Sequence, residues 1–135
     1  MNFRSRLYLH LVLLGLAIFC LNFSSNVTLA SDSDIKIKSA SAESEFPEGI
    51  RFSVEAISTS KIAEIAVNFR IGQQVSGVYE YLDLEGGLEA HGSLFWKTNT
   101  GPKYVPPGTI IDYYFSILDE SGNTLNSENK YLVYS

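Results

Sequence analysis

Cysteine is almost absent from this chain of 135 residues. The single cysteine, Cys20, lies within an apolar N-terminal region. A disulfide framework is therefore excluded, and the rest of the chain must be stabilised by packing alone. Cys20 follows the large Phe19 rather than a small residue, which argues against the lipidation site of a bacterial lipoprotein.

Basic residues and histidines are also scarce. The chain has ten lysines and arginines against fifteen aspartates and glutamates, and its only histidines are His10 and His91. An acidic surface without a basic stripe repels phosphate backbones, so we expect no nucleic-acid binding. With one histidine outside the N-terminal region, no nucleophilic triad can be assembled. We therefore expect no catalytic residues, no enzyme activity and no cofactor.

Metal-binding patterns are weak. Carboxylates cluster at residues 119–123 and 32–34, but neither stretch has the ligand number or glycine placement of a calcium loop. We expect solvated turns at both. His91 and Glu89 could share a metal or acid/base site, but a single histidine on a strand favours an ordinary surface residue. The sequence thus predicts no metal site.

The N-terminus has the layout of a secretory signal. Arg4 and Arg6 precede an apolar run from Leu7 to Phe23, and small and polar residues follow up to Ala30. Residues 1–30 are therefore predicted to be a signal peptide, and the protein to be exported to the cell envelope or the medium. The alternative is an uncleaved anchor, with membrane contact only through residues 7–23. Cleavage would leave eight basic against fifteen acidic residues, a net charge of −7.

Apolar and polar residues alternate through most of the remaining chain. We expect residues 31–45 to form a tail with one short strand, and residues 46–135 to form one domain. Period-two alternation favours strands, although residues 62–69 also have helix-forming residues. Gly92 is expected to mark a bulge. The expected strands are residues 35–39, 50–56, 62–71, 75–84, 88–97, 111–117 and 130–134. This pattern predicts an all-β fold, a single antiparallel β-sandwich following an N-terminal signal helix.

Three short motifs carry a family resemblance. They are Phe-Pro-x-Gly-Ile at residues 46–50, Phe-Arg-x-Gly at residues 69–72 and Pro-Pro-Gly-Thr at residues 106–109. With them, the chain resembles the N-terminal accessory domain of exported bacterial peptidase MA-like metallopeptidases. More broadly, it resembles fibronectin type III and immunoglobulin-like domains in Pro-Gly-Thr at residues 107–109, in the alternation of residues 111–117 and in Asp119-x-x-Gly122-Asn123. Ile111 stands where the fibronectin pattern has its corner tyrosine. Zinc peptidases need two histidines on one helical turn, so the resemblance implies only a non-catalytic accessory module.

Aromatic residues are the candidates for recognition. Five aromatic residues could carry recognition, because planar rings bury a large area at low entropic cost: Trp96, Tyr104, Tyr79, Tyr81 and Tyr114. Of these, Tyr114, Tyr104 and Trp96 are the predicted contacts for a protein or a glycan. Tyr114 is the best surface candidate, since its neighbours Tyr113 and Phe115 face inward. A core position is the favoured interpretation for Trp96. Two functions stay open: a module for protein interaction or spacing, and a glycan-binding module. The partner is expected to be a protein or a cell-envelope component.

Overall fold

The computed structural model describes residues 34–100 and 104–135. The predicted signal peptide at residues 1–30 lies outside the described residues. Within them the secondary structure is all β, and no helix is long and apolar enough to cross a membrane. The strands are β1 (Lys36–Glu45), β2 (Gly49–Ile57), β3 (Ile62–Ile71), β4 (Val78–Tyr81), β5 (Asp83–Gly86), β6 (Glu89–Lys97), β7 (Thr109–Asp119), β8 (Thr124–Asn126) and β9 (Lys130–Tyr134).

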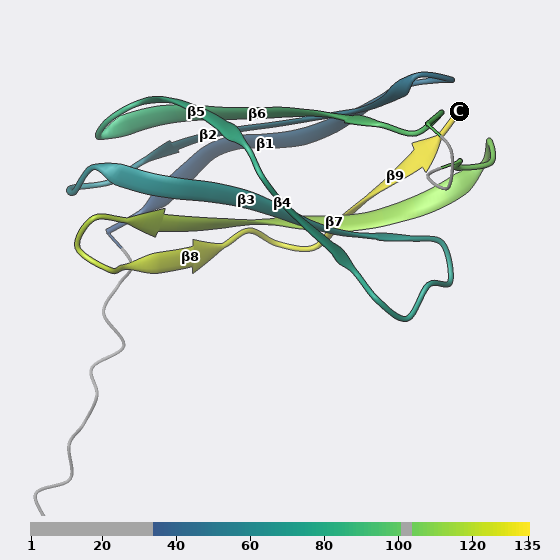
Figure 1. The fold of residues 1–135 in the computed structure, drawn as a ribbon. Coiled ribbons are helices and arrows are strands. Elements are labelled where there is room, and N and C mark those ends of the chain that lie inside the picture. The colour runs from purple at the N-terminus through teal and green to yellow at the C-terminus, as the bar shows by residue number, and fades with distance from the viewer. Residues whose placement is uncertain (1–33, 101–103) are drawn as a thin grey trace, which may run out of the picture. The chain divides into compact units, whose positions relative to one another are not determined.

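These strands form two packed antiparallel sheets (Figure 1). The first sheet has the order β1-β2-β6-β5. The second has the order β4-β3-β7-β8, and β9 also pairs with β7. The predicted fold class, an all-β antiparallel sandwich, is confirmed.

The core lies between the two sheets and follows the predicted alternation. Phe52 of β2 lies near its centre, stacked on Phe69 with ring centroids 5.1 Å apart and in edge contact with Tyr113 and Phe115. Burying one such side chain contributes about 1.5–3 kcal/mol. The alternating inward residues of the two central strands are Ile50, Phe52, Val54 and Ala56 on β2 and Ile111, Tyr113, Phe115 and Ile117 on β7.

The strand predicted at residues 75–84 is divided between the two sheets. Its first part, β4, pairs with β3, whereas its second part, β5, pairs with β6. Leu82 is buried at the crossing, and its N–H donates to the carbonyl of Ile65 at 2.9 Å. Side-chain alternation is the same in both sheets, so the sequence pattern could not reveal the change of sheet.

Two further strand details differ from the prediction. The first strand continues to Glu45 and pairs with β2 along that length, and β8 was not expected. Gly92 marks no bulge, because the pairing of β6 with β2 runs through it without a shift. A Cβ atom at Gly92 would lie 3.2 Å from side-chain atoms of Ile65 and Leu82. Gly92 therefore allows the two sheets to approach closely.

The turn after β7 is built around a buried carboxylate rather than a solvated one. The Asp119 side chain accepts hydrogen bonds from Ser58 Oγ, from the backbone N–H of Ser121, and from the backbone and side-chain amides of Asn123, at 2.9–3.0 Å. Burial raises the pKa of Asp119, but these bonds outweigh it and hold the pKa below its usual value. The solvated turn expected at residues 119–123 is thus a turn held together by the buried carboxylate of Asp119. Among the described residues, no three His, Cys, Asp or Glu are placed to hold a metal ion.

Candidate functional site

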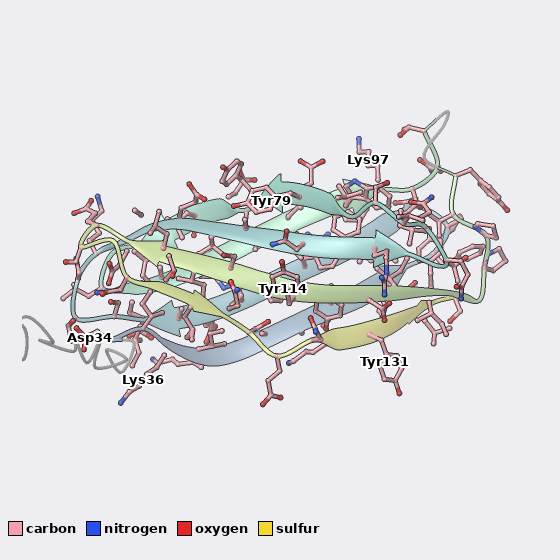
Figure 2. The ribbon with its side chains drawn as sticks, turned by 90° about the horizontal axis from the view of Figure 1, so that it is seen from below. Asp34, Lys36, Tyr79, Lys97, Tyr114 and Tyr131 are labelled. Atoms are coloured by element: carbon pink, nitrogen blue, oxygen red, sulfur yellow. The ribbon has the colours of Figure 1, made fainter. Side chains whose placement is uncertain are left out.

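The outer face of the second sheet collects aromatic and amide side chains from three strands. Because Phe69 and Tyr113 face the core, their neighbours Asn68 and Tyr114 face outward. Asn68 pairs with Tyr79 of β4 on one side and with Tyr114 of β7 on the other. The three side chains therefore form a row across the sheet, and Figure 2 views the molecule from this side.

A second row lies next to the first. Arg70 of β3 pairs with Asp112 of β7, which pairs in turn with Tyr131 of β9. Arg70 Nη2 donates to Asp112 Oδ2 at 2.9 Å, with both side chains about half exposed. Such an exposed ion pair adds only about 0–1 kcal/mol of stability, but it fixes the position of both groups.

The first row, with Arg70 and Asp112 of the second, forms the floor of a groove of about 660 Å³. One wall comes from residues 72–77 between β3 and β4, a connection that hangs below the second sheet in Figure 1. Asn129, on the connection between β8 and β9, contributes from the other side. The lining residues are Asn68, Phe69, Arg70, Val75, Gly77, Val78, Tyr79, Asp112, Tyr113, Tyr114 and Asn129.

Tyr79 is held in place by two neighbours. Its hydroxyl donates to Glu64 Oε1 at 3.2 Å, and its ring contacts Tyr81 edge to face with centroids 5.2 Å apart. Desolvation, followed by the hydrogen bonds and charges of Tyr81 and Glu64, raises the pKa of Tyr79 to about 12. Its hydroxyl therefore stays a neutral donor under physiological conditions.

The structure separates the three aromatic residues singled out from the sequence. Tyr114 is half-buried in the groove, on the outward face as expected. Tyr104 is exposed and lines a different hollow of about 230 Å³. Trp96 also borders that hollow but is 6% exposed, with its ring packed edge-on against Phe69 at 4.9 Å. Trp96 thus lies in the core, and neither residue joins Tyr114.

Tyr79 was among the aromatic residues considered for recognition but was not a predicted contact. Several other residues were not singled out from the sequence: Asn68, Arg70, Asp112, Asn129 and, beside the groove, Tyr131. Alternation alone places most of them on an outward face. It does not say which strands are neighbours, and that pairing is what assembles the rows.

His91 lies on the opposite outer face. It is exposed on β6, where its cross-strand partners are Glu55 of β2 and Glu85 of β5. Glu89, the other member of the pair considered from the sequence, forms an ion pair with Lys38 instead.

Comparison with known proteins identifies no family. No family model matches the chain, and no curated protein matches it. Matches among solved structures include the following two. One is a bromine derivative of BhCBM56, with TM-score 0.44 and 11% identity over 70% of this chain and 88% of that one. The other is a carbohydrate-binding module of family 56, described as a β-1,3-glucan binding domain, with TM-score 0.39 and 9% identity over 73% and 98%.

At these scores and identities the likeness carries no argument about what this chain binds. The resemblance to fibronectin type III domains and to the peptidase accessory domain receives no support from the comparisons. The described residues form an all-β sandwich with a tyrosine-lined groove on its second sheet.

Proposed function

We propose that this protein is a non-catalytic binding module that recognises a glycan in the groove on the second sheet. The row Tyr79–Asn68–Tyr114 beside the Arg70–Asp112 pair carries the proposal. A sugar ring has an apolar C–H face and a rim of hydroxyls. Aromatic rings pack against such a face, while amide, carboxylate and guanidinium groups bond the hydroxyls. A concave site combining both is typical of small-ligand recognition.

The placement of these groups supports recognition without large rearrangement. Asn68 and Tyr114 lie on β3 and β7, the central strands of the second sheet, whose inward residues fill the core. Side chains on such strands are held more precisely than side chains on loops, and tyrosine loses little conformational entropy on binding. Less of the binding free energy is therefore spent on ordering the site.

The carboxylates near the groove support binding rather than hydrolysis. Glycoside hydrolases use two carboxyl groups that flank the scissile bond and exchange protons with it. Asp112 is held by Arg70, and Glu64 accepts the Tyr79 hydroxyl. Both carboxylates thus have structural partners. Export through the predicted leader would bring the groove to polysaccharides outside the cytoplasm.

Binding to polysaccharides tests the proposal directly. The protein is run through native gels that contain neutral glucans, mannans, xylans or cell-wall fractions, with β-1,3-glucan among them. We expect at least one polysaccharide to retard it, and Tyr114→Ala to weaken that binding by about tenfold or more. Tyr104→Ala is the matched control, because it removes an exposed tyrosine outside the groove. The proposal fails if no polysaccharide retards the protein, or if Tyr114→Ala binds like the parent.

The role as a peptidase accessory domain remains a prediction from the sequence resemblance. Its test is genetic: the DNA downstream of Ser135 should encode a helix with two histidines spaced for zinc. A neighbouring set of genes for polysaccharide degradation would favour the glycan-binding proposal instead.

A further inference from the structure

We infer, on the basis of the proposed function, that the ligand is an extended, uncharged glycan chain that crosses the strands from Tyr79 past Tyr114 to Tyr131. The inference rests on the spacing of the three tyrosines and on the charges around them. It goes beyond glycan binding in general, because it specifies both the length and the charge of the ligand.

The three tyrosines follow one another across the outer face, as their labels show in Figure 2. Tyr79 and Tyr114 lie on either side of β3, two strand spacings or roughly 10 Å apart. Tyr131 lies one strand further on, paired with Asp112, two residues before Tyr114 on β7. Three aromatic positions over this distance suit a chain of sugar units rather than one ring.

The line continues past the groove. Tyr131 is 73% exposed and is not among the groove's lining residues, so its ring is open to units that extend beyond them. At the other end Tyr81, which is 60% exposed, stands beside Tyr79. The aromatic surface thus extends on both sides of the groove, which suits the interior of a chain better than its terminus.

The charges around the groove favour a neutral ligand. Arg70 is the only cation among the described lining residues, and Asp112 already accepts its hydrogen bond. Glu64 adds a further negative charge beside Tyr79. A carboxylated glycan would have to displace Asp112 and would meet both acids. A hydroxyl can accept from Arg70 or donate to Asp112 while the pair stays intact.

Ligand length is tested by calorimetric titration of oligosaccharides, from the monosaccharide to the hexasaccharide, in the β-1,3-gluco, β-1,4-gluco, manno and xylo series. For any series that binds, we expect affinity to rise by about tenfold or more with length. Tyr131→Ala should remove most of that rise and leave the affinity for short members unchanged. Tyr104→Ala should follow the parent throughout. Both replaced side chains are exposed, so unchanged circular dichroism and melting temperature confirm folding.

Ligand charge is tested with polygalacturonate and with a carboxylated form of the glucan. We expect both to bind about tenfold or more weakly than the neutral series. Asp112→Asn frees Arg70 and should raise affinity for the carboxylated probes relative to the neutral ones. Any of three results overturns this inference. They are equal affinity for charged and neutral probes, affinity independent of length, and a Tyr131→Ala protein that binds the hexasaccharide like the parent. The proposed function is overturned instead if the protein binds no glycan, or if Tyr114→Ala binds glycans like the parent.

Discussion

The outer face of the first sheet is charged, whereas that of the second sheet is aromatic. On the first, a cross-strand row joins Glu55, His91 and Glu85. Its aromatic side chain, Phe95, lies under the guanidinium of Arg51 at 5.1 Å. On the second, Tyr79, Tyr81 and Tyr131 are 47–73% exposed and Tyr114 is half-buried. The same alternation builds both faces, so the residue types alone make the difference.

The charged first face suits solubility, whereas the proposed function places recognition on the second face. A face of mixed charges stays hydrated and resists association, and a cation lying over a lone ring shields it. The proposed function assigns recognition to the adjacent exposed rings of the second face. The first face is therefore the natural internal control for every change made on the second.

The largest expected effect comes from removing aromatic rings from one face at a time. Tyr79→Ala combined with Tyr114→Ala should lower glycan affinity by about a hundredfold, since both rings lie in one row with Asn68. The matched change on the first face, Phe95→Ala with His91→Ala, should leave affinity unchanged. Titration of both double variants measures this. Equal losses in the two variants would show that the faces do not differ in function.

The ion pairs of the two faces give a second, smaller contrast. Arg70→Gln should weaken glycan binding by about tenfold, because it removes a guanidinium that donates hydrogen bonds to sugar hydroxyls. It also breaks the ion pair that holds Asp112 in position. Arg51→Gln breaks the pair with Glu45 on the first face and should not affect binding. Both pairs are substantially exposed, so each change should alter unfolding free energy by less than about 1 kcal/mol. Denaturant unfolding beside titration separates the two effects, and weaker binding by Arg51→Gln would contradict the assignment.

The fold could be predicted from the sequence because burial imposes a period of two on each strand. The inward set Ile111, Tyr113, Phe115 and Ile117 and the outward direction of Tyr114 both follow from it. The division of one predicted strand between two sheets at Leu82 could not be predicted, because it leaves the alternation unchanged.

The groove could not be predicted from the sequence for a related reason. Tyr79, Asn68 and Tyr114 become neighbours only through the pairing of β3 with β4 and β7. Register between distant segments depends on the loops and on the packing of the whole core. Trp96 shows the opposite case: a core position was the favoured interpretation from the sequence, and its burial and edge contact with Phe69 confirm it.

The smallest expected effect is the titration of a single hydroxyl on the second face. The folded protein raises the pKa of Tyr79 to about 12, above its ordinary value of 10.0, through desolvation and through its contacts with Tyr81 and Glu64. Folding therefore favours the protonated phenol. The stability that the protonated Tyr79 hydroxyl contributes is fully present below its pKa in the unfolded chain, and it is lost as pH rises through its pKa in the folded protein. Ultraviolet absorbance should show Tyr79 ionising late, together with Tyr113, whose pKa is also raised by burial.

Tyr79→Phe should reduce that late transition by one tyrosine, leave the contribution of Tyr113, and leave the rest of the absorbance titration as in the parent. Tyr131→Phe, which replaces a more exposed tyrosine of the same face, is the control and should keep it. Since the ring is retained in Tyr79→Phe, glycan affinity should fall far less than in the alanine variants. A loss as large as that of Tyr79→Ala would mean that the hydroxyl, with its bond to Glu64, recognises the ligand and that stacking contributes little.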